Sequence, residues 1–562
     1  MIHKIWLKQY PAGVPVEVKT DVYPSLVALL DDSFRRYAEF SAYRFMGKRI
    51  SYRVVDEASR ALAAWLQAQG LQRGDRVAIM LPNLPQYPVA VAAVLRAGGV
   101  VVNVNPFYTP RELEHQLKDS GAKAIVVLEH FAATLAQVIE RLPIQTVLLA
   151  AMGDMLGLFK GALVNQGERR DKRRVPAYKL PASVGVTRFN PALASGRRSQ
   201  LNPTQLGPDD IALLQYTGGT TGVSKGAVLL HRNLVANLLQ AEAWFQPALS
   251  KIPAGQQLVT VCALPLHHIF GFNINMMLGL KLGGCSLLIA NERELPALLK
   301  ALAAQPFHSF PAVESLFRAL ASHPQVDRVD WSRLKISVGG GMAVTPATAK
   351  LWLEKTGCTI CEGYGLSETS PSVSCNPVDA TAFSGTIGLP IPGTEMRLLD
   401  DEGRPVAAGQ PGEIAIRGPQ VMAGYWQRPE ETAKVMTADG FLRSGDIGTM
   451  DERGHFRIID RKKDMILVGG FNVYPNEIED VLLQLPGVLE CAAVGLPNDK
   501  SGESVKVVIV KKDATLTEAE VRSFCEAHLA GYKRPRTVEF RAELPKTSAG
   551  KTLRRALREA RR

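Results

Sequence analysis

A stretch rich in glycines and hydroxyl side chains follows directly on an apolar run at 211–214. Glycines let backbone N–H groups approach an anion closely, hydroxyls can donate to phosphate oxygens, and a lysine adds positive charge. The order differs from a Walker A loop, because Ser224 precedes Lys225 and Gly226 follows it. A flexible surface turn is the alternative. We expect a phosphate-binding loop with contacts from Thr217, Gly218, Gly219, Thr220, Thr221, Ser224 and Lys225.

Two other groups contain residue types that can bind a metal. His267 and His268 are adjacent but have no cysteine or aspartate at zinc-ligand spacing. Cys358 and Cys361 form one C-x-x-C pair without a second pair. We expect neither group to bind zinc, and we expect the two cysteines to pack in a strand.

The composition is that of a large globular protein. The chain has 562 residues, 46% of them hydrophobic and 21% charged, which suits several domains rather than a disordered tether. The formal net charge is +12, and the segments 168–198 and 551–562 carry the whole surplus. The rest of the chain is formally neutral, so the sequence does not indicate a nucleic-acid partner.

The cysteines and the apolar stretches bear on the compartment. Seven cysteines are few for this length and odd in number, which suits a reducing compartment such as the cytoplasm. Residues 1–11 lack the apolar core of a signal peptide, and the apolar stretches are interrupted before about 18 residues. We expect neither export nor a membrane span.

Short apolar strands alternate with helical patterns before the phosphate loop. Strands are expected at 77–81, 100–104, 124–128 and 146–149, and a helix over 55–66 is expected to end before Gly70. This is the rhythm of an α/β fold. The periodicity lapses over 166–200, which is rich in charge and follows a short apolar piece at 155–164. We expect a solvated loop there, with a weak contact to an anionic membrane surface as the alternative.

A smaller α+β unit is expected at the C-terminal end. Two apolar strand-like runs bracket the charged residues 460–464, and we place a linker there. Beyond it come a helix at 476–483, strands at 489–494 and 505–510, a helix from Thr517 and a final basic helix. Thr517 with Glu520 fits a capping box. We divide the chain into a domain over 1–460 and a domain over 461–562.

Several separate segments resemble the adenylate-forming superfamily, and within it the bacterial long-chain fatty acyl-CoA synthetases. Besides the phosphate loop they are LPLHH at 264–268, GGGM at 339–342, EGYGLSET at 362–369, SGD at 444–446, DRKKD at 460–464 with GGFN at 469–472, and KTSAGK at 546–551. The run from Asp439 to Lys463 is similar to the signature of the fatty-acid members. The resemblance extends over nearly the whole chain.

The resemblance implies both a fold and a reaction. The fold is α/β, with a large N-terminal domain of two α/β subdomains plus a distorted β-barrel, and a small mobile α+β C-terminal domain. In the reaction a fatty acid attacks the α-phosphate of ATP and expels pyrophosphate, and coenzyme A then displaces AMP from the acyl-AMP intermediate. ATP, Mg²⁺ and coenzyme A are therefore implied, and cations and N–H donors should dominate catalysis.

The resemblance also implies roles for single residues. Lys551 bridges the carboxylate and the α-phosphate, His268 lies near the activated carboxylate, and Glu368 is linked to magnesium together with Thr217. Tyr364 lies along the adenine, and Asp446 accepts from the ribose hydroxyls with help from Arg461. The remaining residues expected to bind ATP or AMP are Gly341, Glu362, Gly363, Gly365 and Thr369.

The last implied roles concern the hinge, coenzyme A and the acyl chain. Lys463 lies at the hinge about which the C-terminal unit rotates between the two half-reactions. Gly469 and Gly470 are expected beside the pantetheine of coenzyme A. The expected acyl-binding residues are His267, Val313, Gly339 and Gly340. Whether the three glycines at 339–341 approach a ligand or only form a bend, large side chains are excluded there.

Three residues depart from the family pattern, and several alternatives stay open. His267 stands where tyrosine is common, Arg443 where histidine is usual, and Glu314 where an amide is common. A carboxyl buried near the acyl tunnel needs a partner or a proton, so chain-length preference is open. An enzyme that stops at acyl-AMP, or that prefers aryl or medium-chain acids, is one alternative, and an anionic-surface binding protein is another. A homodimer and peripheral contact with the inner face of the cytoplasmic membrane also stay open.

Overall fold

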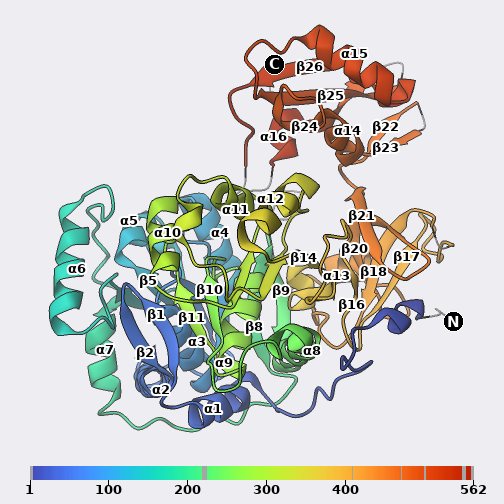
Figure 1. The fold of residues 1–562 in the computed structure, drawn as a ribbon. Helices are drawn as coiled ribbons and strands as arrows, with labels where there is room; N and C mark the ends of the chain where they lie inside the picture. The colour runs from blue at the N-terminus through green and yellow to red at the C-terminus, as the bar shows by residue number, and fades with distance from the viewer. Residues whose placement is uncertain are drawn as a thin grey trace. The chain divides into compact units, whose positions relative to one another are not determined.

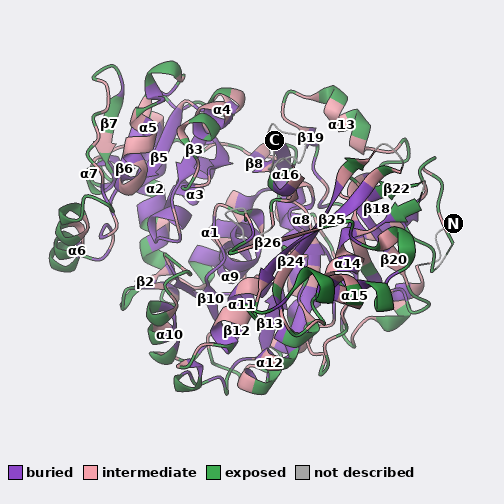
Figure 2. Cartoon of the chain, turned by 90° about the horizontal axis from the view of Figure 1, so that it is seen from above, coloured by how far each residue is buried: buried purple, intermediate pink, exposed green. Residues whose placement is uncertain are grey.

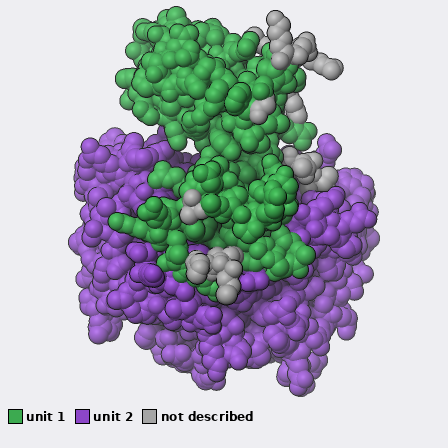
Figure 3. Space-filling view, turned by 90° about the vertical axis from the view of Figure 1, so that its right-hand side faces the viewer, with its two compact units in different colours: residues 1–5, 396–416, 437–562 green, residues 6–395, 417–436 purple. Residues whose placement is uncertain are grey.

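The computed structural model describes residues 4–217, 224–407, 409–469, 471–498, 501–546 and 552–558. The chain forms two compact units (Figure 3). The larger unit comprises 6–395 and 417–436, and the smaller comprises 1–5, 396–416 and 437–562. Residues 396–416 and 437–460 belong to the same compact unit as the C-terminal residues. The domain boundary that we expect after residue 460 stays a prediction.

The larger unit contains an eight-stranded sheet (Figure 1). Six neighbouring strands are parallel, and they confirm the predicted α/β rhythm: β8 (Ile211–Thr217), β4 (Val100–Asn103), β3 (Arg76–Met80), β5 (Ala124–Leu128), β6 (Thr146–Ala150) and β7 (Gly185–Arg188). Two antiparallel strands, β9 (Lys225–Leu230) and β19 (Gly424–Tyr425), complete the edge next to β8. The helices of this region are α2 (Tyr52–Ala68), α3 (Gln86–Arg96), α4 (Pro110–Ser120), α5 (Ala132–Ala136), α6 (Leu158–Arg170), α7 (Phe189–Gly196) and α8 (His231–Leu249).

The second sheet of this unit has nine strands. In order they are β16 (Leu389–Pro390), β15 (Ser372–Cys375), β14 (Ile360–Gly365), β13 (Ile336–Gly339), β12 (Ser309–Ala312), β10 (Val259–Cys262), β11 (Cys285–Leu288), β1 (Ser41–Phe45) and β2 (Lys48–Ser51). The strands from β14 to β1 are parallel. Its helices are α1 (Leu26–Arg36), α9 (Leu278–Lys281), α10 (Leu295–Ala303), α11 (Glu314–Ala321) and α12 (Pro346–Thr356).

Burial follows from the sequence pattern in both sheets (Figure 2). Every residue of α3 is buried, as expected for a helix that is apolar all round. Under the nine-stranded sheet, the Trp352 ring stacks on Phe310 at 5.5 Å and meets Phe317 edge-on at 4.7 Å. Cys358 and Cys361 are both buried, which confirms that they pack. Cys361 lies in β14, as expected, whereas Cys358 precedes that strand. The described residues contain no cluster of three or more His, Cys, Asp or Glu side chains that could hold a metal.

The segment over 166–200 is not the loop that the lost periodicity predicted. It contains the end of α6, the strand β7 and the helix α7. The sequence of α6 shows no helical period of apolar residues, because Gly161 is the only buried residue of this helix and no apolar face is turned inward. Within the described ranges, none of the helices combines the length and the apolar character that crossing a membrane requires.

The smaller unit contains two sheets. The first has the order β17 (Glu395–Leu399), β18 (Gly412–Arg417), β20 (Leu442–Met450) and β21 (Phe456–Arg461), and it occupies the place of the expected barrel. The second consists of β23 (Phe471–Val473), β22 (Ile466–Val468), β25 (Gly502–Lys511), β24 (Val488–Asn498) and β26 (Thr537–Arg541). With the helices α14 (Pro475–Leu482), α15 (Glu518–His528) and α16 (Arg554–Arg558), it confirms the predicted α+β pattern. Thr517 and Glu520 form the predicted capping box.

Candidate active site

Amide side chains at the carboxyl ends of β3, β4 and β8 hold the segment that leads to His267. The side chain of Asn83, just after β3, donates to the carbonyl of Leu264 at 2.9 Å. Gln215 of β8 donates to the carbonyl of His267 at 3.2 Å and accepts from Asn103 of β4 at 3.0 Å. These bonds fix the backbone at the strand ends where ligands bind in parallel α/β sheets.

The two histidines differ in their surroundings. Burial, together with a smaller effect of the neighbouring His268, lowers the pKa of His267 to about 3, so the half-buried His267 ring is neutral near pH 7. Its Nδ1 has no hydrogen-bond partner among the described residues. His268 is exposed, and its Nδ1 accepts from the N–H of Phe270 at 3.3 Å. A π-helix, Gly271–Met277, follows at once, and such helices are frequent at functional sites.

The carboxyl ends of β12 and β13 bring the glycine segment beside Val313. A Cβ atom at Gly339 or Gly340 would lie 2.6 or 2.9 Å from a neighbouring side chain. Gly341 has a φ of +80°, and a Cβ atom there would lie 3.7 Å from Cγ1 of Val313. Larger residues are excluded at 339 and 340 by contact and disfavoured at 341 by conformation, as expected.

Strand β14 and the turn after it carry the residues expected to bind the nucleotide. Glu362 and Tyr364 are buried in β14, where Gly363 and Gly365 also lie. A Cβ atom at Gly365 would lie 1.9 Å from a backbone oxygen, so this position requires glycine. The hydroxyl of Thr369 closes the following turn by accepting a backbone N–H at 3.0 Å. The three neighbouring strands thus place Val313, 339–341 and 362–365 at one end of the nine-stranded sheet, whereas Thr217 and Lys225 lie in the eight-stranded sheet.

Glu368 and Lys225 are linked through Tyr425, a residue that the sequence analysis missed. The Tyr425 hydroxyl donates to Oε1 of Glu368 at 2.8 Å, and burial together with Glu368 raises the Tyr425 pKa. Nζ of Lys225 lies 5.2 Å from the centre of the Tyr425 ring and pairs with Glu431 of α13 (Pro429–Val435). Lys225 and Lys434 lower the pKa of Glu431 to about 2. No motif marked Tyr425 or Glu431, because their partners are distant in the sequence.

The residues on the two sides of the predicted phosphate loop form an antiparallel pair. Thr217, the last residue of β8, lies opposite Lys225, the first residue of β9. The ladder therefore holds together the described residues on both sides of the loop. Gly218, Gly219, Thr220 and Thr221 lie outside the described residues, as do Gly470 and the expected catalytic Lys551.

The departure at Glu314 has a structural explanation. Its side chain is buried at the start of α11, next to Val313. The hydroxyl of Thr348 donates to its Oε1 at 2.7 Å, and Nε of Arg318 lies 3.8 Å away. The expectation that a buried carboxyl here needs a partner is therefore confirmed.

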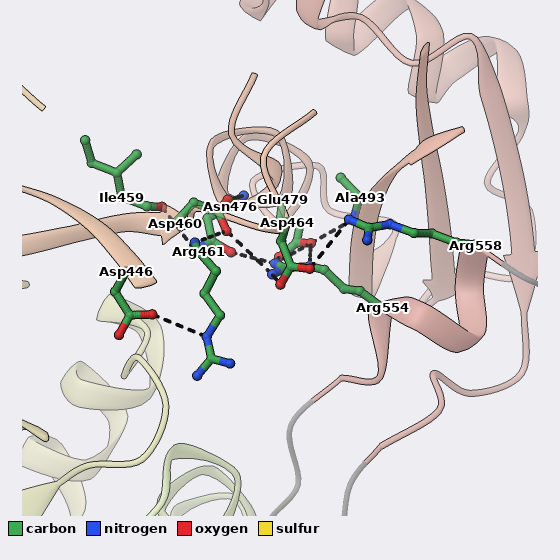
Figure 4. Close-up of polar contacts among 10 residues, drawn as sticks. All are labelled: Asp446, Ile459, Asp460, Arg461, Asp464, Asn476, Glu479, Ala493, Arg554 and Arg558. Carbon is green, nitrogen blue, oxygen red and sulfur yellow. Dashed lines mark hydrogen bonds and ion pairs between the residues drawn. The ribbon is translucent and has the colours of Figure 1, made fainter. Parts of the chain in front are cut away.

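Arg443, another departure, belongs to the group that holds Asp446 in the smaller unit. Two nitrogens of Arg443 donate to Oε2 of the buried Glu413 at 3.0 and 2.6 Å, and the N–H of Gly445 donates to Oε1 at 3.2 Å. Oδ1 of the buried Asp446 lies 3.4 Å from Nε of Arg461, which is its partner in the β20–β21 ladder (Figure 4). Glu413 therefore fixes the turn that presents Asp446, and no sequence signal had indicated it.

The hinge candidate lies between strands of the two sheets of the smaller unit. Lys463 is in the turn that joins β21 to β22. Gly469, at the end of β22, has a φ of +59°, a conformation that other residues rarely adopt. The expected roles of Lys463 and Gly469 stay predictions.

Comparison with protein-family models gives two matches. Residues 30–426 match the model described as AMP-binding enzyme, and residues 477–551 match the AMP-binding enzyme C-terminal domain. The chain belongs to the AMP-binding enzyme family. This member is also 53% identical over 557 residues to the long-chain-fatty-acid–CoA ligase of Escherichia coli O157:H7, with 99% of this chain and 98% of that protein covered.

Solved structures of other proteins share the fold of this AMP-binding enzyme. Crystal structures of ATP-bound MatB from Rhodopseudomonas palustris and of the anthranilate CoA ligase AuaEII in complex with anthranoyl-AMP are 29% and 25% identical to it. The TM-scores are 0.79 and 0.81. The alignments cover 95% and 97% of this chain and 98% and 99% of those chains. The adenylate-forming fold that the resemblance implied is therefore confirmed.

Proposed function

We propose that this protein joins long-chain fatty acids to coenzyme A, using ATP and passing through an acyl-AMP intermediate. The observation that carries the proposal is the 53% identity, over 99% of the chain, to a long-chain-fatty-acid–CoA ligase. In the first half-reaction a carboxylate oxygen bonds to the α-phosphorus while the bond to the β-phosphate breaks, releasing pyrophosphate. In the second, the thiolate of coenzyme A bonds to the acyl carbon and AMP leaves.

The residues of the site have the types that this chemistry needs. Both half-reactions place negative charge on phosphoryl or acyl oxygens, so fixed cations and N–H donors lower their barriers. In the proposal Lys551 bridges the carboxylate and the α-phosphate, Tyr364 lies along the adenine, and Asp446 accepts from the ribose. The amides that hold Leu264–His267 support the placing of His268 near the carboxylate.

The donor set fits a magnesium ion that is shared with the nucleotide. Mg²⁺ prefers one or two carboxylates together with substrate phosphates and water over a cage made by the protein alone. Glu368 offers one carboxylate, whose orientation Tyr425 fixes, and Thr217 offers a hydroxyl at the end of β8. When bound, the ion neutralises charge on the phosphates.

The test is a panel of carboxylic acids of graded length, including aryl acids. Pyrophosphate release and thioester formation are measured for each acid. We expect both products with the long-chain acids, and the length optimum reports the effect of His267 and Glu314. Pyrophosphate without thioester contradicts the proposal and identifies an enzyme that stops at acyl-AMP. If ATP is consumed with none of the acids, the proposed function is wrong altogether.

The hinge role of Lys463 gives a prediction of its own. Proline fixes φ and lacks the N–H group, so Lys463→Pro should hinder rotation while leaving the adenylating arrangement accessible. Thioester formation from supplied acyl-AMP should fall about 100-fold, the loss expected when reacting groups are misplaced by about 1 Å. Pyrophosphate release should be retained. Lys463→Ala, which keeps the N–H group, is the matched control, and equal loss of both half-reactions in Lys463→Pro contradicts the hinge assignment.

We further propose that α6 contacts the anionic inner face of the cytoplasmic membrane. Leu158, Phe159 and Leu163 of this helix are 89%, 89% and 70% exposed. Figure 2 shows most of α6 as exposed. An open groove of about 790 Å³ lies along α6, and Leu158, Arg170 and Arg197 are among the residues that line it. Apolar side chains beside cations are typical of a surface that binds anionic lipid. A protein that makes this contact lies in the cytoplasm. The proposal of a homodimer is supported only by the family resemblance.

The structure sharpens the choice of cations for testing this contact. Arg169 and Arg174 pair with Glu129 and Glu168. Among the residues described, Arg170, Lys172 and Arg173 make no ion pair and are exposed. At about 1 kcal/mol for each cation, the triple change to glutamine should weaken binding to vesicles containing phosphatidylglycerol by about 100-fold.

The measurement is cosedimentation with vesicles at several salt concentrations. Binding should weaken with salt, and the triple change of Leu158, Phe159 and Leu163 to serine should also reduce it. Val54→Ser, at an exposed apolar residue of α2, is the control and should bind as the unchanged protein does. Unchanged binding of both triple variants contradicts the membrane contact.

A further inference from the structure

A buried group of charges surrounds the guanidinium of Arg554 (Figure 4). Its Nη2 lies 2.8 and 2.9 Å from the two oxygens of Glu479 and 2.6 Å from Oδ1 of Asn476. Its Nη1 lies 3.5 Å from Asp464 and 3.6 Å from Asp460. The side chain of Arg554 is only 16% exposed. One cation therefore meets three carboxylates and one amide.

The carboxylates are themselves held by backbone donors. Asp460 is completely buried, and its oxygens accept from the N–H groups of Arg461 at 2.7 Å and Asn476 at 2.8 Å. Oε1 of Glu479 accepts from the N–H of Ala493 at 2.7 Å. These bonds hold the carboxylate oxygens in place independently of Arg554, so the guanidinium binds to acceptors whose positions are fixed.

The positions of these residues in the chain connect two parts of the proposed machinery. Asp460 and Asp464 bracket Lys463, the expected hinge. Arg554 is the first residue of α16 and follows Lys551 by three positions in the sequence. Leu557 of α16, three residues after Arg554 and so on the same face of the helix, is fully buried against the sheet of β24 and β25 and also anchors the helix.

We propose that Arg554 is a positioning residue that ties the segment carrying Lys551 to the hinge residues Asp460 and Asp464 and to Glu479 of α14. The inference rests on the proposed role of Lys551 in adenylation. A planar guanidinium can serve several fixed acceptors in one plane, whereas the ammonium of lysine is a compact point charge on a flexible stem. Arg554→Lys therefore keeps the charge and loses the geometry.

The expected result is a difference between the two half-reactions. Pyrophosphate release in Arg554→Lys should fall by about 10- to 100-fold, because a misplacement of about 1 Å costs up to about 100-fold. Thioester formation from supplied acyl-AMP should stay close to that of the unchanged protein, since Lys551 is not proposed to act in that step. Arg536→Lys is the matched control, because the Arg536 side chain is exposed and makes no ion pair with the described residues.

A double variant separates positioning from simple destabilisation. In the Lys551→Ala protein, adding Arg554→Lys should lower pyrophosphate release no further, because both changes act through one group. Additive losses, or equal loss of both half-reactions, overturn the inference. Glu479→Gln, which keeps the shape of the acceptor, provides a second variant and should show a smaller loss of the same kind. If Lys551→Ala leaves adenylation intact, the proposed role of Lys551 is wrong. If Lys551→Ala lowers adenylation but Arg554→Lys leaves it intact, only the inference about Arg554 is wrong.

Discussion

Replacement of Lys551 by alanine should lower pyrophosphate release by about 100- to 1,000-fold, the loss measured when one fixed donor to developing negative charge is removed. The reason is that the attacking carboxylate and the α-phosphate repel each other, and a cation between them offsets the repulsion. In thioester formation from supplied acyl-AMP the nucleophile attacks the acyl carbon and not the α-phosphate, and Lys551 is not proposed to act there, so that step should change little. The measurement is a comparison of the two half-reactions with a long-chain acid.

The described residues on both sides of Lys551 are held close to one another. Lys546 and Thr552 pair in an antiparallel bridge, and the N–H of Leu553 donates to the carbonyl of Pro545 at 2.8 Å. Lys546→Ala is a suitable control, because Lys546 forms only a half-exposed surface pair with Glu490, and such pairs contribute about 0 to 1 kcal/mol. A loss in Lys546→Ala equal to that in Lys551→Ala contradicts a specific role for Lys551.

Local pattern was sufficient to predict the elements that have one buried face. Strands β3 to β6 and helix α2 were predicted to within a few residues, because their apolar side chains recur with the period of a strand or a helix. Helix α6 was missed for the opposite reason. Its large apolar residues face solvent, and its one buried residue is Gly161, where a Cβ atom would lie 2.5 Å from the carbonyl oxygen of Gly153. A helix that packs through a close backbone contact at a glycine does not need apolar side chains at regular spacing, so its sequence shows no apolar period.

The motifs predicted which residues form the site, but not which residues hold them in place. Glu368 was predicted, whereas its partner Tyr425 lies 57 residues further along the chain. Arg443 was identified only as a departure from the family pattern, and its partner Glu413 is 30 residues away. Contacts at such separations depend on the topology of the sheets, which one sequence does not encode as a local signal. The supporting residues therefore needed the structure.

The charge of Glu368 should be essential for adenylation. Glu368→Gln keeps the shape of the side chain and an oxygen that can accept from the Tyr425 hydroxyl, but it removes the negative charge that a magnesium ion requires. The ratio kcat/KM for ATP should fall by about 100- to 1,000-fold, as when a group that stabilises charge in the transition state is lost. The Mg²⁺ concentration that gives half of the maximal rate should rise in the same variant.

Tyr425→Phe separates the charge of Glu368 from its orientation. This change removes only a hydrogen bond to a charged group, which contributes about 1.5 to 3 kcal/mol. The ratio kcat/KM for ATP should therefore fall by at least about 10-fold, but by less than in Glu368→Gln. The Mg²⁺ requirement should rise less, because the carboxylate keeps its charge. A magnesium titration of pyrophosphate release for both variants measures the difference. If Glu368→Gln lowers the rate without raising the Mg²⁺ requirement, Glu368 acts on the nucleotide in another way, and the link between this carboxylate and the metal is wrong.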